Sequence, residues 1–306
     1  MCCFSQPVRS VSKTRIFARP VDPIWQMLVY SMRLVADGDL AMVLPIPVPP
    51  GSPEDAVRFI DMSSAPKFFD DLDLLFPEPK HQGFGTLRSA APAYAPQPRL
   101  VVHEVGDFEA SFVPTLPDFA RLDPRFRLPP SAWDALPAYR DWGFCVFKLR
   151  LGRRGVAAPE VAPAFGAPSS SPSEKPGLLD RVFGFFGGSP RGRSPDGSSA
   201  PAPRELHPMA FEFPRRQISH LFFPTVHIHD GEVHRTAHFS HTLYAQGASD
   251  SPALRLEWHR SAELAGSLHG ESAAWLDPDR PVHRTTMLGE RPNEDVYLEA
   301  AAVAVT

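Results

Sequence analysis

Proline is the residue that most constrains how this chain can fold. It accounts for 36 of the 306 residues, which is more than twice its usual share in globular proteins. Because proline fixes φ and lacks a backbone N–H, it interrupts both helices and the hydrogen-bonded ladders of sheets. The composition therefore predicts many short strands, broken connections and at least one unfolded stretch.

The rest of the composition is that of a protein with a sizeable core. Hydrophobic residues make up 43% of the chain and charged residues 22%, both close to the average for globular domains. The length allows one large domain or two ordinary ones.

Alternating apolar and polar residues, bounded by turn signals, predict strands in both halves of the chain. The predicted strands cover residues 11–19, 25–35, 40–48, 100–113 (a hairpin), 143–151, 207–213, 218–245, 254–259 and 296–305. Short helices are predicted near 52–55 and at 64–76, 115–118 and 130–140. We therefore expect an α+β fold that is mainly antiparallel β-sheet, sandwich-like, with a few short helices.

Residues 153–204 differ sharply from the sequence on either side. Ala, Pro, Ser, Gly and Arg dominate this stretch, which cannot bury enough apolar surface to offset the entropy lost on folding. We expect a disordered insertion here, with residues 1–152 and 205–306 forming the two parts of a single domain.

The insertion carries one apolar motif between residues 178 and 186. It is either an inert apolar piece of a linker or a docking motif for a protein partner or a membrane surface. The nearby arginines at 191 and 193 favour docking. The contact residues would be Leu178, Leu179, Val182, Phe183, Phe185 and Phe186.

Charge and targeting signals limit the partners and the compartment. The formal net charge of -4 gives no global basic field, so no nucleic-acid partner is expected. No window reaches the ~18 apolar residues of a membrane span, and residues 1–5 lack the pattern of a secretory signal. Three cysteines cannot make a disulfide framework. We expect a cytoplasmic protein with reduced thiols.

The most informative stretch covers residues 222–239, where apolar and polar residues alternate. The Asp-Gly pair at 230–231 is a favoured two-residue hairpin turn between two strands. Since successive side chains point to opposite faces, the predicted core face holds Phe222, Val226, Ile228, Val233, Ala237, Phe239 and Leu243. The other face holds Thr225, His227, His229, Glu232, His234, Thr236 and His238.

In this register His229 faces Glu232, and His227 faces His234. The Cβ atoms of opposed residues lie roughly 4.5–5.5 Å apart, so these side chains converge. Zinc, iron and copper accept imidazole and carboxylate ligands at about 2.0–2.2 Å. The sequence therefore predicts a metal site formed by His227, His229, Glu232, His234 and His238. An open coordination position would allow metal-assisted hydrolysis.

The same pattern has other interpretations. A half-buried antiparallel sheet needs a polar face, which these residues would supply, and they could also line a polar cleft without a metal. Further histidines could complete a metal site, and the sequence does not choose among His207, His220, His241 and His103 beside Glu104.

Cys2 offers a second candidate for catalysis. Removal of Met1 would leave a free α-amino group that can accept the thiol proton, as in N-terminal-nucleophile amidohydrolases, although no convincing partner set follows downstream. Cys2 could instead bind a soft metal, be acylated, or be a buried or free thiol like Cys3. Cys145 lies within a predicted strand and is assigned to the core.

Three segments together resemble a family of uncharacterised bacterial proteins: Met-Cys-Cys-Phe-Ser at 1–5, Leu-Ala-Met-Val-Leu-Pro-Ile-Pro at 40–47, and Phe-Phe-Pro-Thr-Val-His-Ile-His-Asp-Gly-Glu-Val-His at 222–234. The resemblance covers most of the chain outside the insertion and implies a bacterial origin, but no known activity. Three hypotheses result: a metal-binding protein, an N-terminal cysteine amidohydrolase, and a non-catalytic interaction protein.

Overall fold

The computed structural model describes residues 2–76, 103–105, 108–150, 204–247 and 256–300. The predicted insertion lies outside these ranges except for residue 204, and so does its apolar motif at 178–186. Within them, the expected fold class is confirmed, because the chain forms mainly antiparallel β-sheet with a few short helices.

One sheet, here called sheet A, has six strands in the order β12-β1-β4-β8-β7-β6. The strands are β1 (Cys2–Phe4), β4 (Leu40–Ile46), β6 (His103–Val105), β7 (Phe108–Val113), β8 (Gly143–Leu149) and β12 (His227–Ile228). Strand β1 pairs antiparallel with β4 and parallel with β12. Every residue of β4 is buried, as expected for a central strand covered on both faces.

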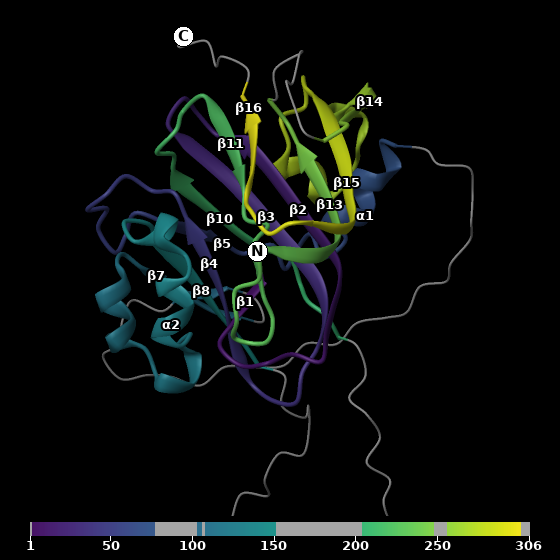
Figure 1. The fold of residues 1–306 in the computed structure, drawn as a ribbon. Coiled ribbons are helices and arrows are strands. Elements are labelled where there is room, and N and C mark those ends of the chain that lie inside the picture. The colour runs from purple at the N-terminus through teal and green to yellow at the C-terminus, as the bar shows by residue number, and fades with distance from the viewer. Residues whose placement is uncertain (1, 77–102, 106–107, 151–203, 248–255, 301–306) are drawn as a thin grey trace, which may run out of the picture. The chain divides into compact units, whose positions relative to one another are not determined.

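The second sheet, sheet B, has the order β14-β15-β13-β2-β3-β10-β5, with β9 also pairing with β3. The strands are β2 (Ser10–Pro20), β3 (Trp25–Val35), β5 (Arg58–Ile60), β9 (Arg204–Glu205), β10 (Met209–Pro214), β13 (Thr236–Ala245), β14 (His259–Leu264) and β15 (Pro281–Pro292). A separate two-stranded sheet joins β11 (His220–Phe223) to β16 (Val296–Glu299). Figure 1 shows how these strands cross the molecule.

The two large sheets share one hydrophobic core. Phe147 of sheet A and Phe211 of sheet B, for example, have ring centroids 5.9 Å apart. A second core lies between sheet B and helix α1 (Phe68–Leu74), where the rings of Phe17 and Phe68 are 5.3 Å apart. The central strand β3 of sheet B is therefore buried on both of its faces.

The helical segments are short, as the prolines predict. Besides α1 they are α2 (Pro130–Asp134) and the 3₁₀ turns η1 (Leu116–Arg121), η2 (Pro124–Phe126), η3 (Pro137–Tyr139), η4 (Ala265–Ser267) and η5 (Glu271–Trp275). The helix predicted near 52–55 is wrong, because only turns lie there. Prolines at 49, 50 and 53 push the residues before them away from helical backbone angles. Among the described helices, none is long and apolar enough to span a membrane.

The predicted hairpin around 230–231 is also wrong. Strand β12 pairs with β1 in sheet A, whereas β13 begins at Thr236 and pairs with β2 and β15 in sheet B. Asp230 stabilises the intervening loop locally by accepting the N–H of Glu232 and by contacting His234 at 2.9 Å. Alternation correctly placed Phe239 and Leu243 in the core, but Thr225 and His227, which were predicted on the polar face, are buried as well. The two strands have their neighbours in different sheets.

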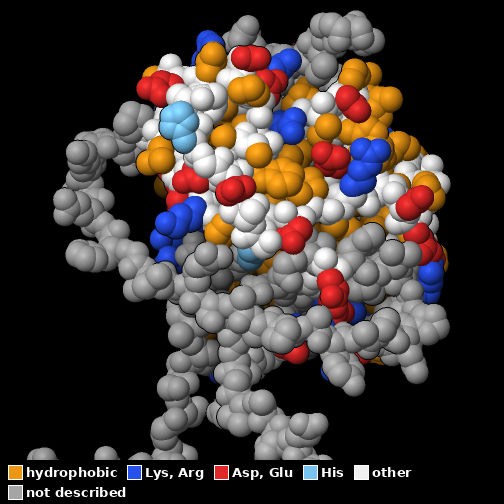
Figure 2. Space-filling view, turned by 180° about the vertical axis from the view of Figure 1, so that it is seen from behind, with side chains coloured by type: hydrophobic (Ala, Val, Ile, Leu, Met, Phe, Trp, Pro, Cys, Tyr) orange, Lys and Arg blue, Asp and Glu red, His pale blue; other side chains and the backbone are white. Residues whose placement is uncertain are grey.

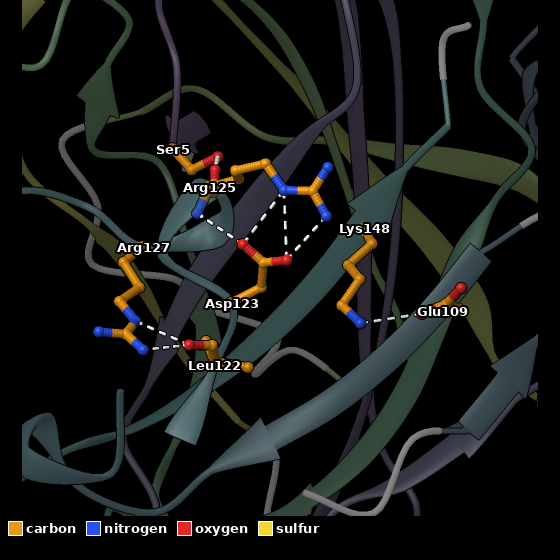
Figure 3. A network of polar contacts seen from close by, with 7 residues as sticks. All are labelled: Ser5, Glu109, Leu122, Asp123, Arg125, Arg127 and Lys148. Atoms are coloured by element: carbon orange, nitrogen blue, oxygen red, sulfur yellow. Dashed lines mark hydrogen bonds and ion pairs between the residues drawn. The ribbon is translucent and has the colours of Figure 1, made fainter. Parts of the chain in front are cut away.

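Polar contacts tie the N-terminal strand to its surroundings (Figure 3). The hydroxyl of Ser5 accepts the N–H of Ala41 and donates to the carbonyl of Arg125. Nearby, Arg125 pairs with Asp123, while the side chain of Lys148 donates to Glu109. Acids and bases thus neutralise one another around a small cavity of about 260 Å³. On the face shown in Figure 2, the coloured acidic and basic side chains are likewise interspersed.

A buried glutamine links β3 to β11, and replacing it tests that link. Gln26 is fully buried; its amide nitrogen donates to the carbonyl of Phe222 at 2.7 Å, and its amide oxygen accepts the N–H of Phe222 at 2.9 Å. We expect Gln26→Leu to lower the free energy of unfolding by about 2–5 kcal/mol, because both backbone groups lose their partner. Gln217→Leu, at an exposed position, should stay within about 0.5 kcal/mol of wild type. Urea unfolding measures both, and equal stabilities would disprove the role of Gln26.

Candidate functional site

Three histidines cluster between the two large sheets. His227 lies on β12, His229 follows it directly, and His241 lies on β13. The Nε2 atoms of His227 and His241 are 3.0 Å apart. The ring of His227 stacks on both neighbours, with centroids 4.8 Å from His229 and 4.7 Å from His241. His227 is therefore the central ring of the cluster, which we call the imidazole cluster.

The strands explain why these rings are buried. Strand β13 has a partner strand on each side, and its residues Phe239, His241 and Leu243 all point into the core shared by the sheets. His241 is consequently only 2% exposed, and His227 is 8% exposed. The ring of Phe239 lies 4.5 Å from that of His227 and so closes one side of the cluster.

On the edge of β12 that has no partner strand, side chains form the hydrogen bonds to the backbone. The amide oxygen of Asn293 accepts the N–H of His227 at 2.7 Å, and its nitrogen donates to the His227 carbonyl at 3.0 Å. The carboxylate of Asp295 accepts the N–H groups of the two preceding residues and the hydroxyl of Tyr139. The loop 293–295 thus fixes the backbone that carries the central ring.

Burial keeps the three imidazoles neutral. Loss of solvation, reinforced by neighbouring positive charge, lowers the pKa of His227 to about 3 and that of His229 to about 4. The same loss of solvation lowers the pKa of His241 well below its ordinary value. The Nε2 of His229 and the Nδ1 of His241 are buried without a hydrogen-bond partner. A neutral imidazole always has one nitrogen able to accept a hydrogen bond or bind a metal.

The structure brings together only part of the predicted ligand set. His227 and His229 are in the cluster, but Glu232, His234 and His238 are exposed, and the predicted opposition of His227 and His234 does not form. Asp230 holds His234 instead and raises the pKa of that ring. Within the described ranges, no three or more His, Cys, Asp or Glu side chains are arranged to hold a metal ion.

His241 was named from the sequence only as one of several further histidines. The sequence pattern does mark His241, because it alternates with polar residues as Phe239 and Leu243 do and therefore lies on the predicted core face. A histidine at an inward position of a central strand marks a polar group that the fold buries. Which other histidine it meets depends on the pairing of β12 with β1, and the local sequence does not encode that pairing.

The sequence permits the cysteines to act as a nucleophile or as metal ligands, but the structure gives little support for either role. Cys3 and Cys145 are buried in the core, and burial raises the pKa of Cys145, which makes its thiol unreactive. Cys2 lies on β1, where its backbone is in register with that of His227. The nucleophilic role of Cys2 stays a prediction.

No family model and no curated protein matches this chain. Among solved structures, it is similar to the crystal structure of baculovirus P35, with a TM-score of 0.45 and 11% identity over 99% of this chain and 100% of that chain. It is also similar to a mutated baculovirus P35 after caspase cleavage, with a TM-score of 0.41 and 11% identity over 95% of this chain and 100% of that one. A chain of the caspase-8/P35 complex matches with a TM-score of 0.38 and 12% identity over 95% and 97% of the two chains.

The buried neutral rings predict a loss of stability in acid. Each folded-state pKa lies below the unfolded value of about 6.5, so the unfolded chain takes up protons first as the pH falls. The contribution is complete above about pH 7 and declines between the unfolded pKa and the folded values of about 3 to 4. Each ring should add about 1.4 kcal/mol per pH unit to the slope in that window.

We expect His241→Gln to reduce this slope by about 1.4 kcal/mol per pH unit. Urea unfolding between pH 7 and 4.5, with EDTA present, measures it. His238→Gln is the matched control at an exposed position and should keep the wild-type slope. Equal slopes in wild type and His241→Gln would show that His241 can be protonated in the folded protein.

Proposed function

We propose that the protein binds a transition metal ion, zinc, iron or copper, through the imidazoles of His227 and His241. The observation that carries the proposal is the 3.0 Å contact between the Nε2 atoms of two buried rings. Two nitrogens bound at 2.0–2.1 Å to a tetrahedral ion lie about 3.3 Å apart. The separation of the two nitrogens is therefore within a few tenths of an ångström of the value that such an ion requires.

His229 is the candidate third ligand. Its Nε2 is buried and has no hydrogen-bond partner, and its ring is stacked on His227. The ring of His229 must turn out of this stack before its nitrogen can meet an ion held by the other two. This requirement agrees with the lack of a ready three-ligand arrangement among the described residues.

Two further features favour metal binding by this pair. Metal ligation requires deprotonated imidazole, and the lowered pKa values of His227 and His241 provide it without proton release at neutral pH. Outer hydrogen bonds orient metal ligands in proteins, and Asn293 holds the backbone of His227 on both its N–H and its carbonyl.

The burial of the cluster shapes the role of the ion. His227 belongs to sheet A and His241 to sheet B, so an ion between them joins the two layers of the sandwich. We propose that the function of the protein is to bind this ion and hold it between the sheets. Metal-assisted hydrolysis would in addition require that water and substrate reach the ion.

Elemental analysis of the purified full chain tests this proposal. We expect near-stoichiometric zinc, iron or copper in wild type and its loss in His227→Ala/His241→Ala. The control His234→Ala/His238→Ala removes two exposed histidines that the sequence predicted as ligands, and it should retain the metal. Circular dichroism checks that each variant is folded.

A second readout separates binding from folding. Zinc added to EDTA-stripped wild type at about 100 times its dissociation constant should stabilise the fold by about 2.7 kcal/mol, seen as a higher melting temperature. The His227→Ala/His241→Ala variant should show no such rise. Absence of metal from wild type expressed in supplemented medium, together with no zinc-dependent rise, would refute the proposal.

A further inference from the structure

The loop 293–295 that holds β12 also lines a larger cleft. The cleft has a volume of about 680 Å³, within the range of small-molecule sites. Its apolar walls come from segments far apart in the chain and include Leu136, Trp142, Val226, Leu256, Met287 and Val296. Such walls favour a ligand with a substantial apolar body.

Arg291 is the cation that lines this cleft. Its Nε donates to the carbonyl of Leu288 at 3.2 Å, which leaves its terminal nitrogens for other acceptors. In the part of the chain that the structure describes, no carboxylate forms an ion pair with Arg291. An unpaired guanidinium beside apolar walls is complementary to an anionic group on an apolar molecule.

The acids that line the cleft are already engaged. The carboxylate of Asp295 accepts three hydrogen bonds, from the hydroxyl of Tyr139 and from two backbone N–H groups. Glu294 is exposed and has a partner of its own. Arg291 is therefore the group of the lining that can pair with an anion, and one guanidinium matches one carboxylate better than a doubly charged phosphate.

We propose that this cleft binds a small apolar molecule with one carboxylate, of the fatty-acid type. The carboxylate pairs with the guanidinium of Arg291, and the hydrocarbon chain lies against the apolar walls. A peptide fits less well, because each of its amide groups would need a hydrogen-bond partner among mostly apolar side chains. This proposal does not depend on the metal site, and its test is carried out in EDTA.

Calorimetric titration of the full chain with decanoate tests the proposal, with decanamide as the neutral analogue. We expect saturable 1:1 binding of decanoate and binding of decanamide that is at least tenfold weaker. Arg291→Gln should weaken decanoate binding at least tenfold and leave decanamide binding unchanged. Arg235→Gln removes an exposed positive charge that does not line the cleft, and it should bind decanoate like wild type.

A blocking variant locates the ligand. Ala138 is an exposed residue on the cleft wall, so Ala138→Trp fills the cleft without disturbing the core and should abolish decanoate binding. The proposal is overturned if wild type does not bind decanoate, if decanamide binds equally well, or if either Arg291→Gln or Ala138→Trp binds decanoate like wild type. Tighter binding of N-acetyl-Leu-Leu than of decanoate would also overturn the assignment to a fatty-acid-type ligand.

Discussion

The short strand β12 depends on side-chain hydrogen bonds along one of its edges, and the candidate site depends on β12. A buried backbone group without a partner costs about 1–3 kcal/mol, so a two-residue strand with one neighbouring strand needs other donors and acceptors. Asn293 supplies them for His227, and Asp295 supplies them for the two residues before it. This loop follows β15 of sheet B and so fixes a strand of sheet A relative to sheet B. The positions of the central imidazole and of one wall of the cleft both follow from it.

The sequence predicted the extent of β3 and the core face of β13, but it placed the buried His227 on a polar face and did not predict the partners of the strands. Strand β3 spans Trp25–Val35 as predicted, and Cys145, Phe239 and Leu243 lie in the core as alternation requires. The hairpin failed because alternation and the Asp-Gly pair are local signals, and the parallel pairing of β12 with β1 joins residues more than 200 positions apart. Local propensity cannot report such a pairing. The candidate site was predicted only in part for the same reason. His227 and His229 were predicted to belong to it, but their contact with His241 forms only when the two sheets pack together.

The imidazole cluster is costly as a purely structural feature. Two ring nitrogens are buried without hydrogen-bond partners, and a polar group left unsatisfied in a protein interior is destabilising. Leucine or phenylalanine would fill the same space without that cost. Three neutral rings within stacking distance are therefore difficult to explain by packing alone, and places where a fold departs from consistent local rules are often functional. With His229 as the third ligand, an ion would satisfy the unpaired Nε2 of that ring, whereas the Nδ1 of His241 would stay unpaired, because the proposed contact uses the Nε2 of His241.

The cleft also contains a polar group that no described acid pairs with, and here the group is a charge rather than a hydrogen-bonding nitrogen. Several cations of the described surface have carboxylate partners, as Lys148 does with Glu109 and Arg216 with Asp141. Arg291 lies among apolar walls with its charge unpaired by any described acid, although Glu294 is only three residues away. Arg291 and the loop 293–295 line the same cleft. A ligand bound there would therefore stabilise the loop, and with it the backbone of His227 that the loop holds.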